Sequence, residues 1–202
     1  AKAMGFYTGL SSNGTLIDAP LARRIAAVGF DYVGISLDGL GQTHDRFRRK
    51  DGAFEASLAA LRLCRDAGIR VGMRFTLTAD NAADLPALLA LAEAERIDKF
   101  YLSHLNYAGR GNRNRGSDAH FQATRRVMDG FFDACWAYQR RGLEKEFVTG
   151  NNDADGAYLL LWARRRFPER AAQLRARLAA WGGNSSGVNV ANIDNLGNVH
   201  PD

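Results

Sequence analysis

Cysteine is scarce in this sequence, which has only Cys64 and Cys135 among its 202 residues. Each follows apolar residues at helical spacing, so we expect two buried thiols on the apolar faces of helices. The sequence contains no CxxC pair and no Cys/His cluster with the spacing of metal ligands, so we expect no metal site in this chain. Two unpaired thiols are also typical of a reducing compartment, which favours a cytoplasmic location.

Long apolar runs are missing as well. No stretch approaches the roughly 18 apolar residues that a membrane helix needs, and the first five residues lack the apolar core of a signal peptide. We therefore expect no membrane partner. Residues 1–5 resemble the last turn of a helix with Gly5 as its stop, and residues 199–202 end inside a hairpin pattern. Both observations lead us to expect a fragment of a longer protein.

Positive charge is in slight excess, with a formal net charge of +5. Arginine carries most of it, in clusters at residues 46–49, 110–115 and 164–166. A basic surface can attract nucleic acid, acidic lipid or a substrate with several carboxylates. Charge alone does not choose among these partners, and such clusters are often only solvated helix faces.

Strand and helix signals alternate over the first two thirds of the chain. Apolar strand-like segments at residues 6–10, 32–35, 69–77 and 100–102 are separated by helical patterns that end at glycines or show the 3.6-residue period. Such alternation predicts βαβ units, a parallel sheet and an α/β fold, either an open sheet or a barrel. A long helix is expected at about residues 118–141, followed by more helix up to residue 181 and a turn at residues 194–198.

Polar residues follow the strands at the end where parallel α/β folds bind their ligands. Asn13, with the turn residues Gly14 and Thr15, could hold a small polar ligand or simply form a turn. Ser36 offers a hydroxyl after the next strand. Arg74 is more informative, because it interrupts a strand that should be apolar. An arginine there needs an anionic partner, either a carboxylate of a ligand or a structural Asp or Glu.

The loop after residue 102 collects residues suited to a large anionic ligand. It contains His104, Tyr107, Arg110 and Arg113 among several glycines and asparagines. A lone histidine such as His104 could ligate a metal, although it is more often a hydrogen-bonded structural residue. A flexible, solvated loop is the alternative interpretation of the whole segment.

Several of these motifs resemble a known family. Ser-Asn-Gly-Thr at residues 12–15 and Gly-Ile-Ser-Leu-Asp-Gly at residues 34–39 are similar to strand ends of radical S-adenosylmethionine (SAM) enzymes with a C-terminal SPASM or twitch region. The segments at residues 99–112, 148–156, 181–184 and 193–202 resemble the group that acts in haem d1 biosynthesis. The CxxxCxxC loop that defines the superfamily is absent from this sequence.

The resemblance implies the later strands of a partial (β/α)6 barrel at residues 1–116, a helical segment at 117–187, and the start of an auxiliary-cluster region at 188–202. It implies SAM, a [4Fe–4S] cluster and an auxiliary iron–sulfur cluster as cofactors, with the cluster ligands outside this chain. It implies a 5′-deoxyadenosyl radical that removes propionate side chains from a sirohaem-derived iron tetrapyrrole, with flavodoxin or ferredoxin as electron donor.

On this basis, Asn13, Ser36 and Arg74 are expected to bind SAM. His104, Tyr107, Arg110 and Arg113 are expected on the substrate side, and no nucleic acid is expected as a partner. Two alternatives stay open: a SPASM-type enzyme that modifies a peptide, and a basic binding module without catalysis.

Overall fold

The computed structural model describes residues 1–107, 110–185 and 188–201. The chain divides into two compact units, Ala1–Asn151 and Asn152–Asp202, and each is described by itself. The domain boundaries expected after residues 116 and 187 remain predictions. The first unit carries the sheet, and its last strand ends just before the division between the units.

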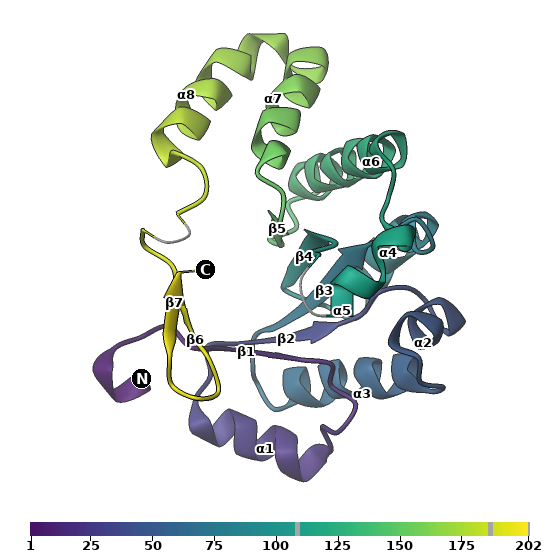
Figure 1. The fold of residues 1–202 in the computed structure, drawn as a ribbon, viewed down its shortest axis with the longest axis vertical. Helices are drawn as coiled ribbons and strands as arrows, with labels where there is room; N and C mark the ends of the chain where they lie inside the picture. The colour runs from purple at the N-terminus through teal and green to yellow at the C-terminus, as the bar shows by residue number, and fades with distance from the viewer. Residues whose placement is uncertain (108–109, 186–187, 202) are drawn as a thin grey trace. The chain divides into compact units, whose positions relative to one another are not determined.

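A five-stranded sheet forms the centre of the first unit (Figure 1). Its strands are β1 (Gly9–Ser12), β2 (Tyr32–Ser36), β3 (Val71–Leu77), β4 (Lys99–His104) and β5 (Glu146–Gly150). They lie side by side in the order of the sequence, and every neighbouring pair is parallel. This arrangement confirms the predicted α/β fold and adds β5, which we had not expected.

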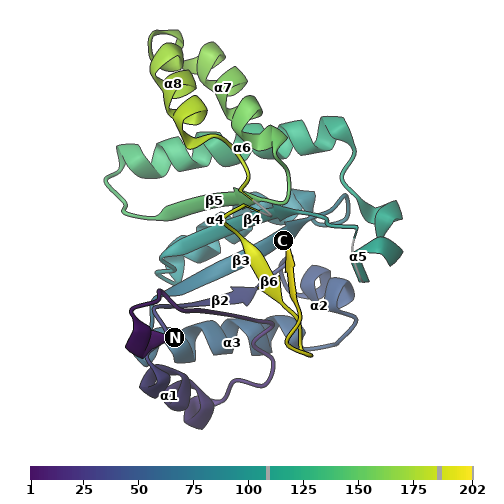
Figure 2. The same cartoon turned by 60° about the vertical axis from the view of Figure 1, so that its left-hand side comes forward.

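The helices of the first unit lie along one side of this sheet (Figures 1 and 2). They are α1 (Ala19–Val28), α2 (Gln42–Arg48), α3 (Ala53–Asp66), α4 (Leu85–Ala94) and α6 (Phe121–Arg140). The short α5 (Arg110–Arg113) lies apart from this layer, beyond the ends of the strands (Figure 2). Local signals set their limits, as α1 shows. The Asp18 side chain accepts from the Leu21 N–H at 2.8 Å, and Gly29 ends the helix in the left-handed conformation.

The core lies between the sheet and these helices. In β3, the side chains that face the helices are at most 1% exposed: Val71, Met73, Phe75 and Leu77. Phe100 of β4 continues this layer, and its ring centroid lies 6.0 Å from that of Phe131 in α6. Because successive strand residues point to opposite faces, the alternate residues of β3 and β4 form the other face of the sheet.

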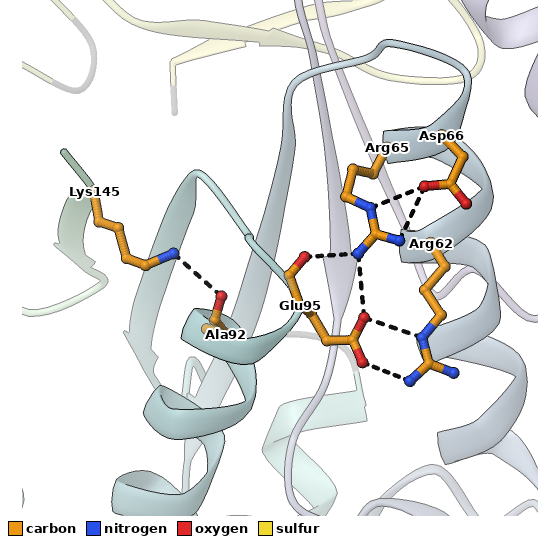
Figure 3. Close-up of polar contacts among 6 residues, drawn as sticks. All are labelled: Arg62, Arg65, Asp66, Ala92, Glu95 and Lys145. Carbon is orange, nitrogen blue, oxygen red and sulfur yellow. Dashed lines mark hydrogen bonds and ion pairs between the residues drawn. The ribbon is translucent and has the colours of Figure 1, made fainter. Parts of the chain in front are cut away.

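Ion pairs and carbonyl contacts join the helical layer at its surface (Figure 3). Glu95, which follows α4, accepts from Arg62 Nε of α3 at 3.0 Å, and its backbone carbonyl accepts from Arg65 Nη1 at 2.8 Å. Lys145 donates to the carbonyls of Ala92 and Ile97 at 3.2 and 2.6 Å. These contacts stabilise the connections between α3, α4 and the start of β5.

The second unit consists of two helices and a hairpin. Its elements are α7 (Ala154–Arg166), α8 (Ala171–Trp181), β6 (Ala191–Ile193) and β7 (Val199–Pro201), with a short 3-10 helix (Pro168–Arg170) between the helices. The expected turn is present, because Asp194 Oδ1 accepts from the N–H groups of Leu196 and Asn198 at 2.8 and 2.9 Å. In the parts of the chain that the structure describes, no helix is long and apolar enough to span a membrane.

Candidate functional site

One face of the sheet carries the candidate site. We call it the inner face, meaning the face opposite the helices. In the three central strands, each residue of this face is a glycine or carries a polar group: Tyr32, Gly34, Ser36, Gly72, Arg74, Thr76, Lys99, Tyr101 and Ser103. A parallel strand is normally apolar on both faces, so this composition indicates a surface built to contact a polar ligand.

The strand register brings the predicted SAM residues together. Ser36 pairs with Arg74 across β2 and β3, and Arg74 pairs with Tyr101 across β3 and β4. Asn13 follows Ser12, whose partner Ile35 precedes Ser36. The register therefore places Ser36, Arg74 and Tyr101 in one row, and Asn13 follows the end of the neighbouring strand β1. We call these four residues the Arg74 row.

Arg74 is half-buried and makes no ion pair with the residues that the structure describes. Its guanidinium carbon lies 4.4 Å from the ring centroid of Tyr101. The structural alternative from the sequence, a salt bridge to an Asp or Glu of the sheet, is thus not realised within the described part of the chain. A half-buried guanidinium without an anion favours an anionic ligand.

The neighbours of Arg74 in its row offer further hydrogen-bonding groups. Ser36 is half-buried, and neither its hydroxyl nor that of Tyr101 bonds to a described residue. The Asn13 carbonyl Oδ1 is already used, because it accepts from the N–H and the hydroxyl of Thr15, each at 3.2 Å. The Asn13 amide nitrogen is the group that this turn leaves for a ligand.

Glycines make room for large side chains on the inner face. A Cβ at Gly72 would lie 2.1 Å from the Tyr32 hydroxyl, and a Cβ at Gly150 would lie 2.0 Å from the Tyr101 hydroxyl. Tyr32 is 8% exposed, and its hydroxyl has no partner among the described residues. Burial raises the pKa of Tyr32. Neither tyrosine could be assigned to the site from the sequence, since the alternation along one strand does not show which side chains meet across several strands.

Asp38 holds the ends of β2 and β3 together rather than facing a ligand. This fully buried carboxylate pairs with Arg48 and accepts from the Thr76 N–H at 2.8 Å. Burial raises the pKa of Asp38, and the Arg48 charge opposes that rise. The Asp38 carbonyl accepts from Asn81 Nδ2 at 2.9 Å. This network supports the C-terminal end of β2, where Ser36 lies.

His44 completes the same network. Its Nδ1 accepts the Asp38 N–H at 2.9 Å, and its ring meets that of Phe54 edge-on. Burial, with a further contribution from Arg48, lowers the pKa of His44 to about 4. The neutral ring is therefore the form that accepts this hydrogen bond at neutral pH.

The expected substrate residues lie in different surroundings. Because strand residues alternate between the two faces, His104 lies on the same face of β4 as Leu102. That face is turned toward the helices, so this placement does not favour contact with a ligand on the inner face. Tyr107 is 46% exposed, and its hydroxyl bonds to Asp118. Arg115 lies over the Tyr107 ring, with its guanidinium carbon 4.8 Å from the centroid.

The backbone of Arg110 and Arg113 belongs to α5, which follows β4. The side chains of both arginines lie outside the described residues. Their predicted contact with substrate, like that of His104 and Tyr107, stays a prediction.

Cys64 and Cys135 are free thiols on α3 and α6, as expected. Cys64 is fully buried, and Cys135 is half-buried. Burial raises the pKa of the Cys135 thiol to about 12, which disfavours the thiolate needed by a metal ligand. Across residues 1–107, 110–185 and 188–201, no group of three or more His, Cys, Asp or Glu could hold a metal ion.

Comparison with known proteins gives a consistent result. A model of the radical SAM superfamily matches residues 1–92. The pre-heme d1 synthase of Dinoroseobacter shibae is 54% identical over 204 residues, covering 100% of this chain and 50% of that protein. The Fe-coproporphyrin III synthase of Methanosarcina barkeri is 39% identical over 202 residues, covering 100% of this chain and 51% of that protein. The chain thus spans about half the length of these curated relatives.

Solved structures resemble the fold at low sequence identity. SuiB of Streptococcus suis, bound to the precursor peptide SuiA, is 15% identical with a TM-score of 0.62, over 79% of this chain and 35% of that chain. The enzyme anSMEcpe with bound AdoMet is 17% identical with a TM-score of 0.59, over 70% of this chain and 39% of that chain. These similarities concern the arrangement of strands and helices.

Proposed function

We propose that this chain is a radical SAM protein, supported by the superfamily model that matches residues 1–92 and by the 54% identity to a pre-heme d1 synthase, and that its inner face binds SAM. Arg74 receives the SAM carboxylate, Ser36 donates its hydroxyl to the same group, and Asn13 uses its free amide nitrogen. The observation that carries this proposal is the half-buried Arg74 guanidinium, which has no anion among the described residues. A guanidinium matches a carboxylate in a forked geometry, so Arg74 would orient SAM as well as attract it.

The chain's residues fit SAM but do not fit an iron–sulfur cluster. Cys64 and Cys135 lie on different helices, and burial raises the pKa of both thiols. We therefore propose that the ligands of the [4Fe–4S] cluster, and those of an auxiliary cluster, belong to other parts of the full-length protein. Held there, the cluster would supply the electron for radical chemistry that starts from SAM, and the residues of the inner face would hold and orient SAM for it.

The full-length protein is proposed to act on an iron tetrapyrrole in haem d1 biosynthesis, removing propionate side chains from a sirohaem-derived ring. The support is the 54% identity to a pre-heme d1 synthase over the whole chain, and the 39% identity to an Fe-coproporphyrin III synthase. A peptide substrate has weaker support, since a PqqA peptide cyclase of Gluconobacter oxydans is 28% identical over 157 residues. Flavodoxin or ferredoxin is the proposed electron donor, and the cytoplasm the proposed location.

SAM binding by the full-length protein tests the first part. Losing a charge-assisted hydrogen bond costs about 1.5–3 kcal/mol, so Arg74→Ala should raise the SAM dissociation constant by roughly 10- to 100-fold. Arg70→Ala is the matched control, because Arg70 precedes the same strand but pairs with Glu146 at 2.9 Å. Unchanged SAM affinity in Arg74→Ala would refute the assignment.

Tetrapyrrole binding tests the second part. Arg110→Ala and Arg113→Ala should weaken binding of an iron tetrapyrrole with propionates, more at low salt than at high salt. Arg140→Ala, at the exposed end of α6, should leave binding unchanged. His104→Ala should change the iron spectrum only if His104 is an axial ligand. Equal tetrapyrrole affinity of the wild type and the double arginine variant would remove the substrate proposal and leave SAM binding standing.

A further inference from the structure

We propose that Tyr101 is a positioning residue for Arg74, and that Gly150 and Gly34 are required for both side chains to lie where they do. The proposal rests on the proposed binding of the SAM carboxylate by Arg74. It deepens that function by assigning to Tyr101, on β4, a role that it exerts through Arg74. The resulting unit, which we call the arginine cradle, consists of Gly34, Arg74, Tyr101 and Gly150.

The first observation is the stacking of Arg74 on Tyr101. The guanidinium carbon lies 4.4 Å from the ring centroid, and the two residues are direct partners in the β3–β4 register. Arginine has a long, flexible side chain, and no ion pair with the described residues restrains this one. The aromatic ring is therefore the contact that selects one position of the guanidinium before the ligand arrives.

The second observation is the space left by glycines on either side. The Tyr101 ring reaches over β5, where a Cβ at Gly150 would lie 2.0 Å from its hydroxyl and 2.8 Å from its Cζ. On the other side, a Cβ at Gly34 would lie 2.8 Å from the Tyr32 hydroxyl and 2.9 Å from Cδ of Arg74. A larger residue at position 150 would displace the Tyr101 ring, and one at position 34 would crowd Arg74 together with Tyr32. Gly150 is thus explained by the stacked pair, and Gly34 by the pair and Tyr32 together.

The ring of Tyr101, rather than its hydroxyl, supplies this contact, since the hydroxyl bonds to no described residue. A phenylalanine at position 101 would keep the stacked surface. An aliphatic residue would fill the space without attracting the guanidinium. Comparing phenylalanine with an aliphatic residue at position 101 therefore distinguishes two roles of Tyr101: positioning the Arg74 guanidinium, and only filling space on the inner face.

The experiment measures the SAM dissociation constant of the full-length protein by equilibrium dialysis without reductant, so that no turnover occurs. Tyr101→Leu should raise the constant by about three- to tenfold, the range expected for a partly desolvated cation–π contact. Tyr101→Phe should stay within about twofold of the wild type. In an Arg74→Met background, Tyr101→Leu should have no further effect, because the cation that it positions is gone.

Gly150→Ala should weaken SAM binding in the same way as Tyr101→Leu, since the added Cβ displaces the ring. Gly130→Ala is its control, because a Cβ at Gly130 meets open space on α6. If Tyr101→Leu does not fold, Gly150→Ala decides the same question in the same two backgrounds.

The outcomes distinguish this inference from the proposed function. No loss of SAM affinity in Arg74→Met would overturn the function and the inference together. A large loss in Arg74→Met with no loss in Tyr101→Leu and Gly150→Ala would overturn the inference alone. An equal effect of Tyr101→Leu with and without Arg74 would also overturn it, because a purely structural role predicts that result.

Discussion

Mild acid should weaken the fold, because His44 resists protonation in the folded protein and accepts a proton in the unfolded chain. The ring is 1% exposed, and its Nδ1 accepts the Asp38 N–H at 2.9 Å. A proton on Nδ1 would remove this acceptor and place a buried positive charge near Arg48. Burial accordingly lowers the pKa of His44 from its ordinary value of 6.5 to about 4.

The magnitude follows from the difference between the folded and unfolded pKa values. As the pH falls below 6.5, His44 in the unfolded chain takes up a proton, whereas His44 in the folded protein does not until about pH 4. The unfolded state binds more protons in this window, so stability is complete above pH 6.5 and decreases as the pH falls toward 4. Each pH unit of this difference corresponds to about 1.4 kcal/mol, giving roughly 3 kcal/mol in total.

Urea unfolding at a series of pH values measures this effect. His44→Gln keeps an uncharged acceptor and removes the titration, so its free energy of unfolding should lose roughly 2–3 kcal/mol less than that of the wild type between neutral pH and pH 4.5. His120→Gln, an exposed histidine before α6, should follow the wild type. Parallel curves for the wild type and His44→Gln would refute the reasoning.

Two further predictions concern other parts of the chain. Gly72→Ala should lower the free energy of unfolding by about 1–3 kcal/mol through overpacking, because its Cβ would lie 2.1 Å from the Tyr32 hydroxyl. Chemical denaturation measures this loss. The explanation is wrong if adding Tyr32→Leu to the Gly72→Ala protein recovers none of the lost stability. The 202-residue chain should stay colourless after anaerobic reconstitution with iron and sulfide, since Cys64 and Cys135 lie on different helices. If the chain instead shows the absorbance of an iron–sulfur cluster in stoichiometric amount, the proposal that the cluster ligands lie outside this chain is wrong.

Much of the sheet could be predicted because its strands carry strong local signals. β3 alternates fully buried apolar residues with inner-face residues, and Arg74 stands out against that pattern. β5 was missed because Glu146–Gly150 is short, half-buried throughout and joined to the sheet only through β4. A signal was present in Phe147, Val148 and Thr149, which are residue types common in strands.

α2 escaped prediction for a different reason. Its sequence is charged and has no apolar period, so tertiary contacts stabilise it instead. His44 is buried against the Asp38 turn, and the Asp45 carboxylate accepts from the N–H groups of Gly52 and Phe54, each at 2.8 Å. Such contacts depend on chain segments that meet only after folding.

The candidate site was predictable in part. Asn13 and Ser36 were predicted as site residues from polar strand ends, and Arg74 from its place in an otherwise apolar strand. The parallel register places Ser36 beside Arg74, and the binding of SAM by all three stays a prediction. Tyr101 was not found, because its contact with Arg74 depends on the register between two strands and on the space above Gly150. Neither property is encoded in the pattern of a single strand.

The most direct test of the central claim compares SAM with decarboxylated SAM as ligands of the full-length protein. If Arg74 receives the carboxylate, the wild type should bind SAM at least about tenfold more tightly than the decarboxylated analogue, as expected for a charge-assisted contact. In Arg74→Met this preference for SAM should fall sharply, because the guanidinium that receives the carboxylate is gone. An unchanged preference for SAM in Arg74→Met would contradict the account, because the carboxylate would then be recognised elsewhere.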